Sequence, residues 1–179
     1  MMPAITMRQN HASVSEMARH LQDCDTSFVP LLSQRVDIGL YAGKLVTHAE
    51  CFEAWSTDRL LGCVALYCNA TDRGTAFISN VSVLPDCTGQ GLARALLSHA
   101  VAFVALAGFA RVALEVHRAN KAALALYRGA GFHEVPCPDA VTTGAATRPD
   151  TCRLELSLRA LPPMADRAGP SNRVSGAAP

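Results

Sequence analysis

The stretch NVSVLPDCTGQGLARALL, residues 80–97, decides which class of fold this chain adopts. An alternating apolar run leads through a proline turn to two close glycines, Gly89 and Gly91, and then to a helix-like pattern. Glycine accepts left-handed backbone angles, so the loop can simply turn a corner. A glycine loop between a strand and a helix start can also hold an anion on its free amides. The stretch alone leaves both interpretations open.

The residues after this stretch continue the alternation of helices and strands. An apolar stripe predicts a helix over residues 91–107 that ends at Gly108, with the stripe formed by Leu92, Leu96, Ala100 and Phe103. The β-branched run RVALEV predicts a strand, and ANKAALALYRGAG predicts a helix that ends at Gly131. Two closing antiparallel strands are expected at FHEVPC, residues 132–137, and TCRLELSLR, residues 151–159.

The residues up to Val83 predict a short first strand, two helices and three further strands. ITMRQ near the start fits a short strand, and Ser13 with Glu16 forms a capping box ahead of a helix. A second helix is expected to begin near Asp37. The period then changes to that of strands at ECFEAW, LLGCVALYCN and TAFISNVSV, residues 50–83. This order predicts a mixed α/β domain with a central sheet.

Composition restricts the classes of protein to which the chain can belong. Its 179 residues, half of them hydrophobic, suit a single domain over residues 1–160, with its core at 50–159 and a disordered tail at 161–179. The formal net charge of +1, without long charged runs, predicts no nucleic-acid partner. No membrane-length apolar run and no leader pattern are seen, so we expect no membrane partner and a cytoplasmic location.

Cysteine and histidine spacing gives no sign of a metal site. The seven cysteines are scattered without a C-x-x-C pair, which favours reduced and mostly buried thiols. His20 and four other histidines lack the spacing of metal ligands, and we expect them on the surface or in packing roles. Nucleophilic catalysis by serine is also disfavoured, because no G-x-S-x-G motif is present.

Two segments, residues 80–97 and LEVHRANKAALALYRGAGF at 114–132, resemble the core of the GCN5-related N-acetyltransferase (GNAT) family. The resemblance extends from about Glu50 to Val135. It implies an α/β fold with a central mixed, mostly antiparallel and twisted sheet flanked by helices. It also implies an enzyme that uses acetyl-coenzyme A as co-substrate and needs no metal.

The same resemblance assigns the cofactor-binding residues. The family loop reads (Arg or Gln)-x-x-Gly-x-(Gly or Ala) and holds the pyrophosphate on its amides, and Thr88 departs from its first position. Gln90 or Arg94 is then expected to take over the missing long side chain. The strand at Val81, Ser82 and Val83 would pair with the pantetheine arm through its backbone. The cofactor-binding set is Val81, Ser82, Val83, Thr88, Gly89, Gln90, Gly91, Leu92, Ala93, Arg94, Asn120 and Tyr127.

Acetyl transfer to an amine needs a base for the amine proton and benefits from an acid at the leaving sulfur. Tyr127, in LYRGAGF, matches the tyrosine that the family uses as this acid, and the alternative is an aromatic that packs the helix on the sheet. Glu115 is the candidate base, because it lies on the opposite strand face from the neighbouring apolar residues. His117 shares that face, and a water chain remains a third route. Asn120 either binds the pantetheine or caps the last helix.

The sequence gives the least information about the acceptor substrate. The segment LLSQRVDIGLYAGKL and the hairpin turn WSTDR are expected to shape the acceptor side, with Tyr41 and Trp55 as a wall or Trp55 in the core. A small-molecule amine such as an amino sugar or amino acid is the first hypothesis, and a protein N-terminal amine or lysine is the second. The alternative from a different functional class is a module that binds coenzyme A but catalyses no reaction. The protein is expected to be a monomer or a homodimer.

Overall fold

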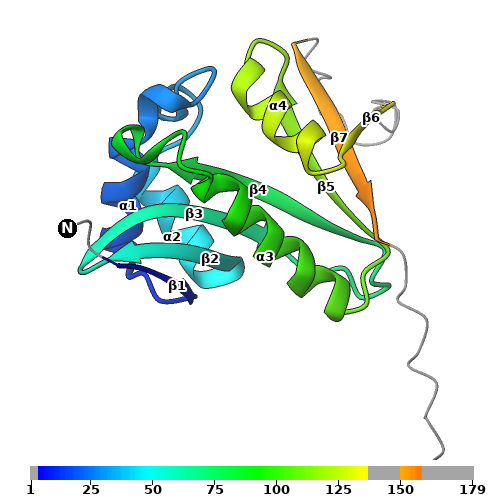
Figure 1. The fold of residues 1–179 in the computed structure, drawn as a ribbon, viewed down its shortest axis with the longest axis horizontal. Coiled ribbons are helices and arrows are strands. Elements are labelled where there is room, and N and C mark those ends of the chain that lie inside the picture. The colour runs from blue at the N-terminus through cyan, green and yellow to red at the C-terminus, as the bar shows by residue number, and fades with distance from the viewer. Residues whose placement is uncertain (1–3, 137–149, 159–179) are drawn as a thin grey trace, which may run out of the picture.

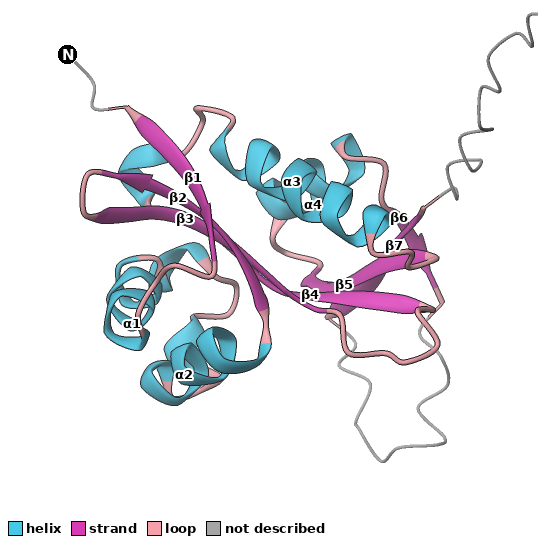
Figure 2. Ribbon diagram, turned by 90° about the horizontal axis from the view of Figure 1, so that it is seen from below, coloured by secondary structure: helices cyan, strands magenta, loops and turns pink. Residues whose placement is uncertain are grey.

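The computed structural model describes residues 4–136 and 150–158 and contains a seven-stranded sheet between two layers of helices (Figures 1 and 2). The strand order is β1-β2-β3-β4-β5-β7-β6. β4 and β5 run parallel, and every other neighbouring pair is antiparallel. The mixed, mostly antiparallel sheet that the sequence and its family resemblance predict is thus confirmed.

The N-terminal part of the chain forms one strand and two helices, and each helix begins directly after a capping residue. β1 spans Ile5–Gln9, and α1 spans Val14–Asp23 behind the complete Ser13 and Glu16 capping box. α2 spans Ile38–His48, and the Asp37 carboxylate accepts a hydrogen bond from the Leu40 amide at 2.9 Å. Both helices therefore begin where the sequence predicts, because each cap residue satisfies an amide that the helix leaves without a partner.

The central strands follow the predicted hairpin. β2 spans Glu50–Ser56, β3 spans Arg59–Tyr67 and β4 spans Thr75–Val83. The register between β3 and β4 shifts, since Leu66 pairs with Ile78 and Ala65 pairs with Asn80. Ser79 is therefore an extra residue, and such a bulge moves the side chains that follow to opposite faces of the sheet.

The C-terminal half supplies the remaining elements: α3 at Leu92–Leu106, β5 at Arg111–His117, α4 at Lys121–Gly129, β6 at His133–Val135 and β7 at Thr151–Ser157. Gly108 and Gly131 have positive φ angles of 82° and 95° just past the two helices, as their predicted role in ending them requires. β7 inserts between β5 and β6, so the two closing strands do pair antiparallel. The predicted C-terminal tail at 161–179 lies outside the described residues.

Two cores lie on the two faces of the sheet, and Figure 2 shows α3 and α4 on one side with α1 and α2 on the other. The larger core joins Leu96 of α3, Leu124 of α4 and Leu114 of β5. The smaller core joins Leu21 of α1 and Leu45 of α2 to β2 and β3. Within the described ranges, none of the helices has both the length and the apolar character needed to cross a bilayer.

Candidate active site

The two parallel strands at the centre of the sheet separate part of the way along. β4 and β5 pair only from Thr75–Ile78 to Arg111–Leu114, while β4 continues to Val83 and β5 to His117 (Figure 1). We call the region between the two separated strand ends the fork. Backbone groups of β4 beyond Ile78 have no partner in β5, so an extended ligand can add to this edge as a strand would.

A cavity of about 590 Å³ occupies the fork. Most of the predicted site residues line it together, although they come from β4, the glycine loop, β5 and α4. They are Val81, Ser82, Val83, Thr88, Gly89, Ala93, Glu115, Asn120 and Tyr127. The N-terminal part of the chain supplies a further wall, with Tyr41 and six residues between Ser27 and Val36.

The glycine loop has free space above its backbone. Gly89 and Gly91 have φ angles of 76° and 77°, and a Cβ atom built on either would meet no heavy atom within 4 Å. Gly91 is the N-cap of α3, and the first bond of the helix runs from the Ala95 amide to the Gly91 carbonyl. The amides of residues 92–94 therefore precede the ladder, which is the arrangement that binds anions at helix starts.

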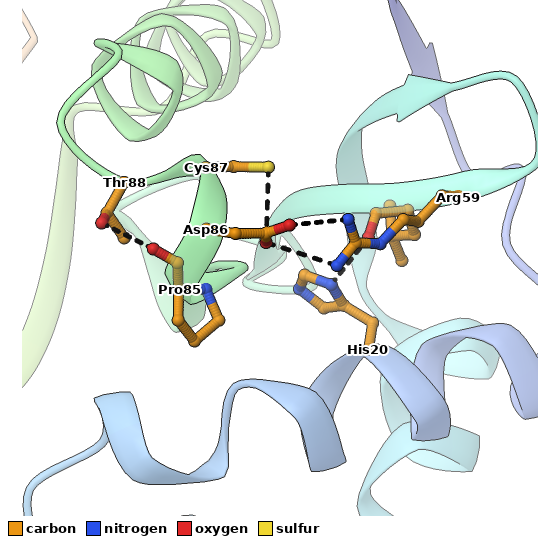
Figure 3. Close-up of polar contacts among 7 residues, drawn as sticks. His20, Arg59, Pro85, Asp86, Cys87 and Thr88 are labelled. Carbon is orange, nitrogen blue, oxygen red and sulfur yellow. Dashed lines mark hydrogen bonds and ion pairs between the residues drawn. The ribbon is translucent and has the colours of Figure 1, made fainter.

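The turn before the loop is held by two polar contacts (Figure 3). The Thr88 hydroxyl donates to the Pro85 carbonyl at 2.9 Å, and the Arg59 guanidinium pairs with the Asp86 carboxylate at 2.8 Å. Thr88 thus uses its side chain within its own turn. The short Thr88 side chain therefore stabilises the turn through a contact with the main chain.

Some predicted loop residues do not line the cavity. Leu92 is buried in the larger core, while Gln90, Gly91 and Arg94 are exposed beside the loop. Arg94 extends toward α4, because a Cβ atom on Gly129 would lie 3.4 Å from its guanidinium. A basic side chain therefore lies between α3 and α4, next to the loop that it was expected to assist.

Tyr127 lies on α4 with its ring beside that of Phe132, at 5.9 Å between the centroids. It lines the cavity but is only 7% exposed. Burial raises the pKa of Tyr127 well above its usual value, so the phenol stays protonated at every physiological pH. In the described part of the chain its hydroxyl has no hydrogen-bond partner, which leaves the proton available to a ligand.

Asn120 does cap the last helix. Its Oδ1 atom accepts a hydrogen bond from the Ala123 amide at 3.1 Å, while the residue also lines the cavity. An asparagine amide carries two further donors on its nitrogen. Capping therefore leaves the Nδ2 group available for the ligand contact that the family resemblance implies, and the two predicted roles are compatible.

Glu115 and His117 line the cavity from β5, as do Leu114 and Val116, which are also buried in the larger core. His117 accepts a hydrogen bond from the Ala119 amide on Nδ1 at 3.1 Å. A neutral imidazole with Nδ1 as acceptor carries its proton on Nε2, so it has no lone pair left for a substrate proton. Glu115 is exposed and has no ion pair with a described residue. The geometry thus favours Glu115 over His117 as the base.

Ser82 takes part in a buried polar network that the sequence did not predict. Its hydroxyl lies 2.9 Å from Nε2 of His20 and accepts from the Asn80 amide at 3.0 Å. Nδ1 of His20 lies 3.1 Å from the Leu60 carbonyl, which can only accept, so Nε2 is the acceptor for Ser82. Only the backbone of Ser82 therefore remains for a ligand in the fork. His20 has a packing role, as expected, but its partner is 62 residues away.

For the acceptor wall, the structure decides for the core between the two uses expected of Trp55, contradicts the expected role of the hairpin turn, and adds two residues. Trp55 is 2% exposed and donates from Nε1 to the buried Glu53 carboxylate at 2.8 Å, so it belongs to the core and not to the wall. The hairpin turn around it does not line the cavity either. The missed wall residues are Phe28 and Val29, whose sequence surroundings show no functional pattern. Among the described residues, no cluster of potential metal ligands is present.

A model of the "Acetyltransferase (GNAT) family" matches residues 14–132. The chain therefore belongs to this family, and the resemblance seen in the sequence is confirmed. The match includes the glycine loop, both predicted catalytic residues and the helices that border the cavity.

Curated relatives share a shorter stretch. [Ribosomal protein bS18]-alanine N-acetyltransferase of Escherichia coli (strain K12) is 46% identical over 63 residues, which are 35% of this chain and 41% of that protein. Mycothiol acetyltransferase of Geodermatophilus obscurus is 39% identical over 85 residues, 45% of this chain and 28% of that protein. The matched segments thus span less than half the length of either relative.

Solved structures share the fold over most of the chain. The crystal structure of the Escherichia coli S18-alanine N-acetyltransferase has a TM-score of 0.65 at 22% identity, with 87% of this chain and 94% of that chain covered. PaiA N-acetyltransferase of Thermoplasma acidophilum, solved in complex with coenzyme A, has a TM-score of 0.62 at 16% identity and covers 86% and 99%. At these identities the likeness concerns the fold.

Proposed function

We propose that the protein is an acetyl-coenzyme A dependent N-acetyltransferase whose acceptor is a small primary amine, such as an amino sugar or an amino acid. One observation carries the proposal: a single cavity in the fork joins an open glycine loop to an uncommitted phenol, Tyr127, and an uncommitted carboxylate, Glu115. Family membership and a neighbour solved with coenzyme A support the choice of cofactor.

The chain's residues fit acetyl-coenzyme A in three places. The amides of residues 88–94 and the start of α3 would hold the pyrophosphate, where a Cβ atom on either glycine would meet only free space. The backbone of Val81 to Val83 would pair with the pantetheine, and Nδ2 of Asn120 would donate to it. When bound, the cofactor supplies an acetyl group activated as a thioester.

The amine attacks the thioester carbonyl directly, so that a C–N bond forms and the C–S bond breaks. A free alkylamine has a pKa near ~10.4 and is mostly protonated at neutral pH, so a base must take its proton. Glu115 lines the cavity and would take this proton, directly or through water. Tyr127 donates its proton to the departing sulfur, and burial keeps that proton in place until then.

A protein N-terminal amine is the second candidate acceptor. It is favoured by the relative that is named for the alanine of a ribosomal protein. The other curated relative, in contrast, is named mycothiol acetyltransferase, a name that mentions no protein acceptor. A coenzyme A binding module without catalysis is less well supported, because the fork keeps both the phenol and the carboxylate accessible. The cytoplasmic location and the oligomeric state stay predictions.

Calorimetric titration with acetyl-coenzyme A tests the cofactor site. We expect micromolar binding, much weaker binding of adenosine 3′,5′-bisphosphate, and at least tenfold weaker acetyl-coenzyme A binding in Gly91→Arg, whose side chain would fill the space above the loop. Gly91→Ala is the matched control, because it carries the same backbone strain of roughly 1–2 kcal/mol without the bulk. Equal affinities of Gly91→Arg and the wild type would refute the phosphate-loop assignment.

A further inference from the structure

Two opposite charges line the cavity, and the described part of the chain provides no ion-pair partner for either. Arg35, directly after the short helix η2 at Leu32–Gln34, and Glu115 of β5 both line the cavity. Neither forms an ion pair with another residue in the described ranges. A cation and an anion that face one cavity without pairing to each other can each bind an opposite charge of a ligand.

Arg35 lies near Tyr41, and Glu115 stands opposite Ser79, whose carbonyl Tyr41 contacts. Ile78 and Leu114 form the last pair between β4 and β5, so Ser79 and Glu115 stand opposite each other where the strands begin to separate. The Ser79 carbonyl accepts a hydrogen bond from the Tyr41 hydroxyl at 2.9 Å. Burial raises the pKa of Tyr41 to about 12, and the positive charge of Arg35 is near enough to act against that rise. Tyr41 therefore connects the Arg35 side of the cavity to the Glu115 side.

The neighbouring charges on the sheet are already paired with one another. Arg153 stands opposite Glu115 in β7, but its Nε donates to the Glu155 carboxylate at 3.0 Å. Glu155 also pairs with Arg111 at 3.7 Å. These contacts leave Glu115 as the carboxylate presented to the cavity. The N-terminal wall of the cavity is apolar at Phe28, Leu32 and Val36.

We propose that the acceptor is a primary amine that also carries a carboxylate, in particular an amino acid with an apolar side chain. The amine of this amino acid would lie at Glu115, and its carboxylate would form a bidentate, charge-assisted contact with Arg35. Its side chain would pack on the apolar wall. Arg35 thereby determines specificity. The inference rests on the proposed N-acetyltransferase function, and among its candidate acceptors it selects amino acids over amino sugars.

Pairs of amines that differ only in the carboxylate test the inference. L-Leucine with L-leucinamide, and L-phenylalanine with L-phenylalaninamide, are assayed for release of coenzyme A, with products verified by mass spectrometry. Glucosamine and a peptide with N-terminal alanine complete the set. An uncharged carboxyl derivative has an α-amino pKa of about 7.7–8.0, and a free carboxylate raises it, so intrinsic reactivity at neutral pH favours the amides. A preference for the acids therefore reports recognition by the protein.

We expect kcat/KM to be higher for each acid than for its amide. Arg35→Ala should lower kcat/KM for the acids by roughly 10- to 100-fold while changing the amides less than about threefold, as expected for loss of a charge-assisted contact. Lys44→Ala is the control, because it removes an exposed cation of α2 that does not line the cavity. Acetyl-coenzyme A affinity should be the same in all three proteins.

The outcomes separate the inference from the function on which it rests. Turnover of amines without preference for the carboxylate, or an equal loss for acids and amides in Arg35→Ala, overturns the inference and keeps the N-acetyltransferase. Faster turnover of glucosamine or of the peptide also overturns it. Failure to acetylate any of these amines contradicts the proposed small-amine function as well.

Discussion

Burial shifts the pKa of individual titratable side chains in and behind the fork and so determines whether each one is protonated. Tyr127 and His20 are both almost fully buried, and burial favours the neutral form of each. For Tyr127 this keeps a proton available for donation. For His20 it keeps Nε2 free to accept from Ser82. The same physical effect therefore supports a proposed chemical role in one case and a structural role in the other.

Tyr127→Phe should lower kcat by a factor on the order of 10² to 10⁴, because the departing sulfur then leaves without a proton donor. The affinity for acetyl-coenzyme A should change little, since the ring and its contact with Phe132 remain. Steady-state kinetics together with calorimetry make the comparison. Wild-type turnover in this variant would show that Tyr127 is not the acid.

The stability of the protein should fall in mild acid because of His20. Burial lowers the pKa of His20 to about 4, whereas the unfolded chain binds the proton near ~6.5. Its contribution is therefore complete above pH 6.5 and is lost as the pH falls toward 4, by about 2 kcal/mol at pH 5. Urea unfolding at pH 7.5 and 5.0 measures this loss, and His20→Gln should show a smaller difference. An identical difference in both proteins would argue against the assignment.

Two features of the secondary-structure elements position the site: a bulge in β4 and a close approach between β3 and α3. The Ser79 bulge moves the side chains of β4 to the other face, so that Ile78 and Val83 both pack in the larger core while Asn80 and Ser82 face α1. Gly62 of β3 lets α3 lie close to the sheet, because a Cβ atom there would meet Leu96 at 3.0 Å and Val83 at 3.1 Å. The start of α3 thus lies beside the fork.

Two glycine substitutions should have opposite effects on stability. Gly62→Ala should lower the unfolding free energy by about 1–3 kcal/mol, because the added methyl overpacks the contact between β3 and α3. Gly43→Ala should raise it by about 0.5–1 kcal/mol, because Gly43 lies inside α2 and its Cβ atom would lie 4.0 Å from Val14. Urea denaturation compares both variants with the wild type. A higher unfolding free energy in Gly62→Ala would refute the close approach between β3 and α3.

Across the whole molecule, the fork lies between two halves of the sheet that share few strand contacts. β1 to β4 form one half, β5 to β7 form the other, and four pairs of residues between β4 and β5 connect them (Figure 1). The cavity has walls from both halves. A ligand that contacts both walls should stabilise their relative position, so cofactor binding is coupled to the stability of the whole fold.

Acetyl-coenzyme A at 100 times its Kd should stabilise the protein by about 2.7 kcal/mol. For a chain of this size, this corresponds to a rise in Tm of roughly 5–10 °C. Differential scanning fluorimetry measures the rise, and Gly91→Arg at the same ligand concentration should show no more than about half of it, because tenfold weaker binding lowers the stabilisation to about 1.4 kcal/mol. No rise in the wild type would contradict the proposed cofactor site.

Much of the fold and part of the candidate site could be predicted from local sequence. The helix expected over residues 91–107 occupies Leu92–Leu106, and the cap residues Ser13, Asp37 and Asn120 each begin a helix. Caps and glycine stops act within one turn of the chain, so their residues are visible in the sequence. The contact of His20 with Ser82 was not predictable in this way, because its partner comes from a distant segment.

The sequence by itself determined the elements, their order and the chemistry of the glycine loop, because these depend on residues within a few positions of one another. Only the tertiary structure decided which groups face the fork. The Ser79 bulge reverses the alternation of β4, the separation of β4 from β5 presents Glu115, and the Ala119 amide occupies the lone pair of His117. Each follows from register and packing between segments, and a one-residue change of register moves every later side chain to the other face of a strand.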